Sequence, residues 1–478
     1  MALIEALEKA IGKDNVLSSE EACRPYECDA LSAYRQKPLA VALPENVDQV
    51  RQVLKLCKQY QTPVITRGSG TGLAGGTLPQ ADSVILGLAK LNQILQIDPL
   101  QRTAIVQPGV RNITISEAAA KYNLYYAPDP SSQIACSIGG NVAENSGGVH
   151  CLKYGLTVHN VTSITVLDMD GDPIIFDEKD DGIDLLALMN GSEGLLGVIV
   201  EIKLKLLPKP EAAQLVMAAF NSVDQCADAV TSVLKQGIIP AGLEMMDQFA
   251  IQAAEDFAQV GYPTDAAALL LCEVDGSHDQ VQVDSQRVAD ILSANGAHQI
   301  QVSQNESQRL ALWQGRKNAF PAVGRYSPDY YCMDGTIPRS QLAYVLQKIS
   351  QLSNKYGLRV ANVFHAGDGN LHPLILYDAN KPGELEQTEK FGAEILRLCV
   401  DVGGTITGEH GVGVEKLDSM CHQYSDAELE VFHGIKKVFD NTGLLNPGKA
   451  VPTLHRCAEL GHMHVHNNQL PHPELERF

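Results

Sequence analysis

Two short motifs in the last third of the chain bring together residue types that bind metal ions and transfer protons. The first is His365-Ala-Gly-Asp-Gly-Asn-Leu-His372, and the second is Glu409-His410, with a glycine on each side. Two imidazoles and one carboxylate can hold a divalent cation and leave a coordination position for a substrate. We therefore predict a metal site, for Zn²⁺ or Mn²⁺, at His365, His372 and Glu409.

His410 follows a predicted ligand directly and is itself free to act as a base. A metal lowers the pKa of a bound hydroxyl, and a neutral imidazole with the ordinary pKa of about 6.5 can accept the hydroxyl proton. Any one of these histidines alone would more often cap a turn or fill a core. Together, in two motifs rich in glycine, they favour a catalytic site with His410 as general base.

An anionic substrate also needs a cation. On a predicted helix over residues 306–319, Arg316 shares an apolar stretch with Leu312 and Trp313. Its planar guanidinium can bind a carboxylate through two parallel hydrogen bonds. Lys317 and Arg325 are alternatives. Because an arginine on a helix more often faces solvent, Arg316 is a hypothesis at this point.

The first motif lies between two extended segments, residues 360–364 and 373–377, joined by a Gly-Asp-Gly-Asn turn. This pattern predicts a hairpin that brings His365 and His372 close together. Around it, residues 215–220, 242–246 and 268–274 are typical of strands, and residues 223–235, 280–294 and 342–355 of helices. The second half of the chain is therefore predicted to be an α+β domain.

The first half contains a glycine-rich run at residues 67–79, directly after a predicted strand. Gly70, Gly72 and Gly75 form a G-x-G-x-x-G pattern, but a dinucleotide fingerprint must open a helix. Here Gly76-Thr-Leu-Pro79 would break one. A Walker A loop is excluded too, because no Lys-Ser/Thr closes the run. The run remains a loop dense in backbone N–H groups that could wrap a pyrophosphate.

A second cluster of small residues covers residues 137–148, preceded by Pro128-Asp129-Pro130. Small residues let a flat ring system pack against the main chain. Further along, Leu207-Pro-Lys-Pro210 can continue neither a helix nor a strand and is predicted to be a domain boundary.

These glycine motifs resemble, in order, the FAD-binding domain of the vanillyl-alcohol-oxidase/PCMH flavoproteins. The resemblance covers residues 35–213 and implies tightly but noncovalently bound FAD, because Thr71 stands where covalent members often carry a His. Cys136 and His150 remain possible attachment points. The resemblance, with the C-terminal motif described below, implies FAD contacts at Arg67, Gly68, Ser69, Gly70, Thr71, Gly72, Pro108, Gly109, Pro128, Asp129, Ser132, Gly139, Gly140, Asn141, Asn145, Gly147, Gly148, Glu193, Gly197, Val198 and Asn446.

The second half, from residue 214 to the closing Leu-Leu-Asn446-Pro-Gly-Lys, resembles the C-terminal domain of the FAD-linked D-2-hydroxy-acid dehydrogenases. In that family His365, His372 and Glu409 match the metal ligands, His410 the base and Arg316 the carboxylate-binding arginine. Members that act on a dicarboxylate hold its second carboxylate with a Lys and a Thr. No such cation stands at Phe320 or at residues 330–332, which favours a substrate with one carboxylate.

The resemblance implies a fold class of α+β with four parts. These are an N-terminal segment (residues 1–34) packed on the FAD domain, a PCMH-type FAD-binding domain (35–213), an FAD-linked oxidase C-terminal substrate domain (214–450) and a tail (451–478). The implied reaction is oxidation of a small 2-hydroxy acid, glycolate or D-lactate, with hydride passing to flavin N5.

Several further stretches, among them residues 25–29, 131–136 and 327–335, are similar to the FAD subunits of bacterial glycolate-oxidising members. That likeness implies a second flavoprotein-like subunit and an iron–sulfur subunit as partners. None of the eleven cysteines forms a C-x-x-C pair, so a cluster on this chain is disfavoured. A stand-alone D-lactate dehydrogenase and a noncatalytic flavin-binding subunit of a larger assembly remain alternatives.

Composition excludes other classes. The 478 residues carry a formal charge of −20, which argues against a nucleic-acid partner. No run of 18 uncharged apolar residues occurs, so no membrane-spanning helix is predicted, and the N-terminus lacks the pattern of a signal peptide. We expect a cytoplasmic protein that partner subunits could hold at the inner face of the cell membrane. The His-rich tail could bind metal, although a solvated tail is the simpler expectation.

Overall fold

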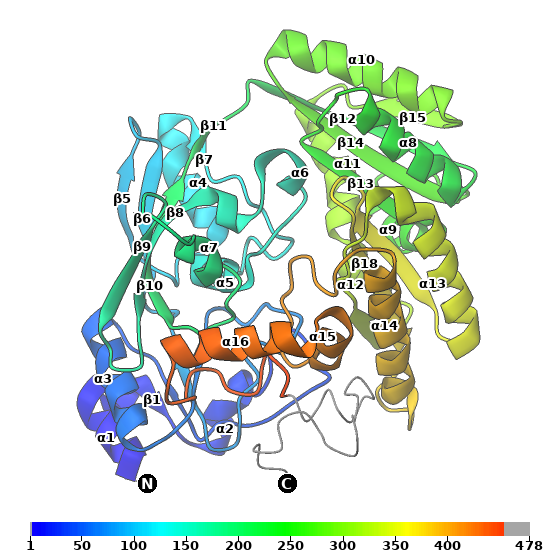
Figure 1. Ribbon diagram of the computed structural model, residues 1–478. Helices are drawn as coiled ribbons and strands as arrows, with labels where there is room; N and C mark the ends of the chain where they lie inside the picture. Colours follow the sequence, from blue (N-terminus) through cyan, green and yellow to red (C-terminus); the bar gives the residue numbers. More distant parts are fainter. Residues whose placement is uncertain (1, 454–478) are drawn as a thin grey trace.

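The computed structural model describes residues 2–453, in which two halves face each other (Figure 1). The blue and cyan first half holds two small sheets, and the green and yellow second half is built on one large sheet. The His-rich tail of the sequence lies outside the described residues. No helix of the described part is long and apolar enough to cross a membrane.

The first small sheet has the order β1 (Val16–Leu17), β2 (Ala40–Ala42), β4 (Val84–Gly87), β3 (Val64–Arg67), and β2, β4 and β3 run parallel. Helices α1 (Ala2–Ile11) and α3 (Val47–Gln59) pack on it. In α3 the buried Val50, Val53, Leu54 and Cys57 recur at helical spacing. The glycine-rich run therefore leaves the end of a buried strand, β3.

The second small sheet is antiparallel, with the order β5 (Ile94–Asp98), β6 (Thr103–Val106), β10 (Val198–Lys205), β8 (Val161–Leu167), β9 (Pro173–Asp177). Helices α4 (Asn112–Ala119), α5 (Ile138–Glu144) and α7 (Leu185–Met189) accompany it. The second cluster of small residues begins with helix α5. The predicted domain boundary at residues 207–210 begins with a short strand, β11 (Leu207–Pro208). This strand pairs with β7 (Leu124–Tyr125). A proline fits there because this two-residue ladder is an edge.

The large sheet has the order β15 (Gln299–Val302), β12 (Ala212–Phe220), β14 (Ala268–Gly276), β13 (Gly242–Asp247), β17 (Val360–His365), β18 (Asn370–Tyr377), β16 (Asp329–Cys332). Helices cover both faces. One core joins the sheet to α8 (Val223–Lys235), α10 (His278–Ala294), α13 (Leu342–Tyr356) and α14 (Glu384–Asp401), and the other joins it to α9 (Gln248–Ala258), α11 (Glu306–Lys317) and α12 (Ala319–Val323). From Leu215 to Phe220, successive residues of strand β12 alternate between the two cores, which explains why this stretch is entirely apolar.

The end of the described chain returns to the first half. After α15 (Leu417–Gln423), helix α16 (Asp426–Phe439) lies across the lower part of the molecule (Figure 1). Lys436 on α16 donates to the Leu195 carbonyl at 2.7 Å, and Leu445 forms a parallel bridge with Val64 of β3. The segment predicted to close the substrate domain therefore packs against the FAD half. The remaining short elements are α2 (Glu20–Cys23), α6 (Cys151–Tyr154) and 3₁₀ turns at Lys13–Asn15, Arg24–Tyr26, Ala120–Tyr122, Thr157–Asn160 and Arg339–Gln341.

Candidate active site

The predicted hairpin forms, and it brings the two histidines of the first motif together. The ring centroids of His365 and His372 are 5.1 Å apart, with the rings nearly perpendicular. Glu409 reaches them from the loop between α14 and α15, with its Oε1 3.0 Å from His372 Nε2 and 3.4 Å from His365 Nε2. The possible ligand atoms of all three side chains lie within 4.8 Å of one another.

The other ring nitrogen of each histidine is held by the protein. His365 Nδ1 lies 2.7 Å from Glu244 Oε1, and His372 Nδ1 lies 3.3 Å from the Met333 carbonyl oxygen. Donation from Nδ1–H to these partners is the support expected for metal-binding histidines, and each Nε2, which faces Glu409, would then offer its lone pair to a cation. A tetrahedral cation with bonds of about 2.0 Å separates its ligand atoms by about 3.3 Å. The three side chains therefore fit a divalent cation.

Cys332, with His372 and His410, forms a second group of possible ligands in the described part of the chain. Burial raises the pKa of the Cys332 thiol well above its usual value. His410 Nδ1 has no hydrogen-bond partner, so this group lacks the support that Glu244 gives His365, and the set containing Glu409 is favoured. Burial alone would raise the pKa of Glu409, but hydrogen bonds from the two histidines outweigh it and hold that pKa well below its usual range.

His410 lies beside this cluster, with its ring stacked on His372 at a centroid distance of 5.0 Å. Its Nε2 is 4.0 Å from Glu409 Oε1, and its buried Nδ1 has no hydrogen-bond partner. Burial lowers the pKa of His410 to about 4, and the nearby Asp334 carboxylate only partly opposes this. The ring is therefore neutral and can accept a proton. Its pKa lies below the ordinary value assumed from the sequence, because the sequence does not reveal burial.

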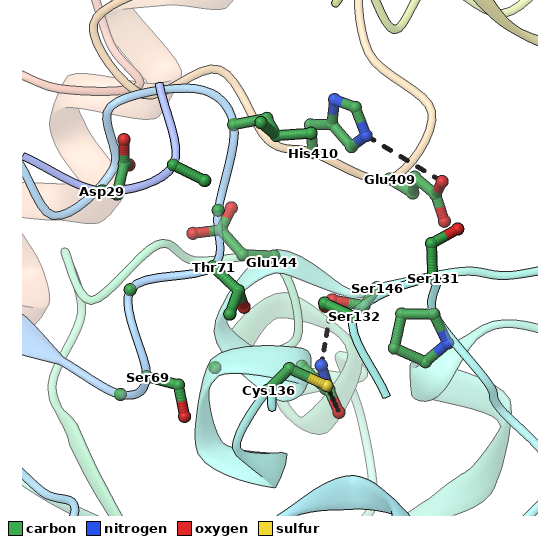
Figure 2. Close-up of a pocket in the computed structure, with 18 of the residues that line it drawn as sticks. Asp29, Ser69, Thr71, Ser131, Ser132, Cys136, Glu144, Ser146, Glu409 and His410 are labelled. Carbon is green, nitrogen blue, oxygen red and sulfur yellow. Dashed lines mark hydrogen bonds and ion pairs between the residues drawn. The ribbon is translucent and has the colours of Figure 1, made fainter. Parts of the chain in front are cut away.

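A cavity of about 540 Å³ separates His410 from the glycine loops of the first half. Figure 2 shows Glu409 and His410 on one side of it and Ser69, Thr71 and Ser132 on the other. The second half also contributes Lys317, Phe320, Pro321 and His372 to the wall. The two motifs and the glycine loops thus face the same space, as the sequence interpretation required.

Many residues predicted to contact FAD line this cavity or an adjoining one of about 60 Å³. They are Gly68, Ser69, Gly70, Thr71, Gly72, Pro108, Ser132, Gly139, Gly140, Asn141, Glu193 and Gly197. Cys136 also lines the larger cavity, whereas His150 lies between Asp129 and Glu273, next to a separate cavity. Contact with FAD stays a prediction for each of them.

The other predicted FAD residues lie behind the walls and shape them. Arg67 Nη1 donates to the Cys28 carbonyl, and Asn446 Nδ2 donates to the carbonyl oxygens of Gly76 and Glu193. Gly148 has φ +140°, and a Cβ there would lie 2.5 Å from a backbone oxygen, so another side chain would not fit. Gly109, Pro128, Asp129, Asn145, Gly147 and Val198 are likewise not part of the walls of these two cavities.

Arg316 is buried on α11, and its guanidinium faces Glu244. The Arg316 Nε and Nη2 atoms lie 3.0 and 2.7 Å from Glu244 Oε2. Glu244 therefore bridges Arg316 and His365, and it occupies the Nε/Nη2 edge, one of the two edges through which a guanidinium can bind a carboxylate. Lys317, the predicted alternative, lines the cavity. Arg325, the other alternative, donates to the Asp256 carbonyl at 2.6 Å, away from the site.

The sequence analysis missed several acidic groups at the site. Glu244 stands on β13 between Leu243 and Met245, and a charge within a short apolar run is a usable signal of a paired, buried group. Asp29 and Glu144 both line the cavity (Figure 2). Burial raises the pKa of Asp29 to about 6, and burial together with Glu193 raises that of Glu144 well above its usual value. No spacing in the sequence pointed to these two.

Comparison with known proteins agrees with this architecture. Residues 38–177 match an FAD binding domain family, and residues 209–450 match the family "FAD linked oxidases, C-terminal domain". The solved structure of p-cresol methylhydroxylase with substrate bound has the same fold, with a TM-score of 0.80 and 18% identity over 95% of this chain and 97% of that chain.

Relatives are similar along almost the whole chain. Glycolate oxidase subunit GlcD of Escherichia coli K12 is 58% identical over all of this chain and 96% of its own. The Bacillus subtilis GlcD subunit is 38% identical (93% and 96%), and a D-lactate dehydrogenase of Anaerostipes hadrus is 30% identical (92% and 95%). The chain therefore belongs to the FAD-linked oxidases of the PCMH-type superfamily, in the group that includes the GlcD subunits, and is an FAD-dependent oxidoreductase.

Proposed function

We propose that the chain oxidises a small 2-hydroxy acid with one carboxylate to the 2-oxo acid, with glycolate as the preferred substrate and D-lactate as the second candidate. The observation that supports this is the group of His365, His372, Glu409 and His410 across one cavity from the glycine loops. Glycolate takes precedence because the GlcD relative is 58% identical, against 30% for the D-lactate dehydrogenase.

The residues of the site fit FAD and a divalent cation, the two groups that such a reaction needs. Backbone of the glycine loops can approach a flat cofactor, and Thr71 offers no ring nitrogen for a covalent bond, so FAD would be held noncovalently. His365, His372 and Glu409 would hold a divalent cation, Zn²⁺ or Mn²⁺. Bound FAD supplies the hydride acceptor at N5, and a cation lowers the pKa of a substrate hydroxyl.

Oxidation removes a hydride from the α-carbon and a proton from the α-hydroxyl, and the C–O bond becomes C=O. His410 takes the proton: burial keeps its ring neutral, and a neutral imidazole can accept a proton. Lys317 on the cavity wall attracts the substrate carboxylate. Arg316 is paired with the buried Glu244, so its charge is largely balanced within the protein. The family resemblance implies that Arg316 binds the substrate carboxylate directly. That contact requires a guanidinium N–H that Glu244 does not engage.

We further propose that the chain works with a second flavoprotein-like subunit and an iron–sulfur subunit, which would take the electrons onward. The relatives are described as subunits, which implies other chains. A cytoplasmic location, or one at the inner face of the membrane through these partners, is consistent with the lack of a spanning helix in the described residues. The complete set of ligands and base disfavours a noncatalytic flavin-binding role.

Anaerobic reduction of the flavin tests the proposal. Purified protein should be yellow, release its FAD on acid treatment, and lose its visible absorbance with glycolate faster than with D-lactate, L-lactate or D-2-hydroxyglutarate. Absorbance unchanged by every acid of the panel, in protein that contains FAD and metal, would refute the proposed reaction. Faster bleaching by D-lactate than by glycolate would instead reassign the substrate.

A further inference from the structure

Glu409 and His410 lie in a segment without regular secondary structure, between α14 and α15. A metal ligand and a base must keep a fixed spacing to the flavin site, and neither a helix nor a strand holds them here. Two buried carboxylates accept most of the backbone N–H groups of this segment, residues 407–413. One comes from each half of the molecule, and neither has a role in the proposed reaction.

Asp334, just after β16 in the second half, holds the first part of the segment. It is completely buried. Its Oδ2 accepts hydrogen bonds from the backbone N–H of Gly408 at 3.0 Å and of His410 at 2.9 Å. The Glu409 N–H lies 3.3 Å from both carboxylate oxygens, and the Thr407 hydroxyl donates to Oδ2 at 2.6 Å. Three successive amides, including those of the ligand and the base, thus converge on one side chain.

Glu193, in the first half, holds the second part. Its Oε1 accepts from the Val412 N–H and its Oε2 from the Gly413 N–H, each at 2.7 Å. Gly411, at φ +80°, makes the turn between the two parts, and a Cβ there would lie 2.2 Å from Glu144 Oε2. Glu193 was expected to contact FAD, but both of its carboxylate oxygens are engaged by this segment.

We propose that Asp334 and Glu193 are positioning residues that together set the distance between the metal-ligand cluster and the flavin cavity. Hydrogen bonds from amides to a carboxylate are charge-assisted and stronger than neutral ones. Asp334 fixes Glu409 and His410 relative to the β17–β18 hairpin, whereas Glu193 fixes the same segment relative to the glycine loops. The consequence for catalysis rests on the proposed function, but the hydrogen bonds that hold residues 407–413 do not depend on it.

The test uses the full-length protein with FAD bound and three variants. Asp334→Asn and Glu193→Gln each replace one accepting oxygen by an NH₂ group that faces N–H donors. Asp247→Asn is the matched control, because Asp247 is a half-buried carboxylate that also accepts two backbone N–H bonds, from Ala250 and Asn362, but lines no part of the cavity. The readouts are hydrogen–deuterium exchange of residues 405–416, metal content, and the limiting rate and half-saturating substrate concentration of anaerobic flavin reduction.

Both site variants should exchange the amides of residues 407–413 faster than wild type while retaining FAD, and the control should not. Asp334→Asn should also lower metal affinity about 10- to 100-fold, the usual effect of removing support behind a ligand. Glu193→Gln should keep the metal and the half-saturating concentration but lower the limiting rate about 100-fold, as displacement of a catalytic group by about 1 Å does.

If the amides of residues 407–413 exchange at the wild-type rate in both variants, the two carboxylates do not hold the segment, and the inference is wrong. Faster amide exchange with an unchanged limiting rate of flavin reduction would show that the carboxylates hold the segment but do not position the catalytic groups. That result would also overturn the inference. Wild-type protein that no hydroxy acid reduces would refute the proposed function instead, and the exchange data alone would then decide whether the two carboxylates hold the segment. Rescue of the rate in Asp334→Glu, which restores the carboxylate, would support positioning over a general loss of stability.

Discussion

Replacing Glu244 by Gln should weaken the metal site and the fold together, because one carboxylate supports both. Its Oε1 lies 2.7 Å from His365 Nδ1, and its Oε2 lies 2.7 Å from Arg316 Nη2. At an effective dielectric constant of about 20, two unit charges at that distance attract by about 6 kcal/mol, most of which offsets their desolvation. Gln keeps the shape but leaves the Arg316 charge buried without a counter-charge.

Removing one partner of a buried ion pair costs about 3–5 kcal/mol, and we expect the free energy of unfolding to fall by this order. Loss of the support behind His365 should separately lower metal affinity by about 10- to 100-fold, which is about 1.4–2.7 kcal/mol. Urea unfolding with FAD bound measures the first effect, and titration against a competing chelator at low temperature measures the second.

Glu273→Gln is the matched control for Glu244→Gln. Glu273 lies on the neighbouring strand β14 and pairs with Arg309 at 2.6 Å, but it takes no part in the metal-ligand cluster. It should lose stability by a similar order and keep its metal affinity. If Glu244→Gln binds metal within about twofold of wild type, the carboxylate does not tune His365 as a ligand, and the interpretation of the cluster as a supported metal site is refuted.

The remaining predictions concern the base, the substrate anchor, the cation and the contact between the halves. His410→Ala should keep FAD and metal but slow anaerobic flavin reduction about 10²- to 10⁴-fold, and an unchanged rate would remove it as the base. Lys317→Met should raise the half-saturating hydroxy-acid concentration about two- to fivefold with little change in limiting rate, whereas an effect on rate alone would contradict an anchoring role. Dialysis against a chelator should stop turnover with FAD still bound, and Zn²⁺ or Mn²⁺ should restore it; turnover that survives metal loss would exclude a cation from the reaction. Burial opposes protonation of His150, but Asp129 and Glu273 outweigh it and raise its pKa to about 10, so its contribution to stability is complete below about pH 6.5 and is lost as the pH rises through 10. Melting temperatures between pH 6 and 10 should therefore fall more in wild type than in His150→Gln, and parallel curves would contradict this.

Local patterns in the sequence determined most of the elements near the site. The hairpin that carries His365 and His372 was predicted from two apolar runs around a Gly-Asp-Gly-Asn turn, because turn chemistry and strand periodicity act over a few residues. The dinucleotide fingerprint was rejected for an equally local reason, since Gly76 to Pro79 cannot continue a helix. The structure agrees, and the chain passes from the glycine run to strand β4.

Only the tertiary structure decided which charges meet. Arg316 looked free for a substrate because nothing near it in the sequence indicated Glu244, 72 positions away. The low pKa of His410 and the engagement of Glu193 by Val412 and Gly413 arise in the same way. Residue types and their spacing reveal which groups could do chemistry. Burial and pairing between distant segments set their charge states and partners, because electrostatic interactions depend on distance in space and on the exclusion of water.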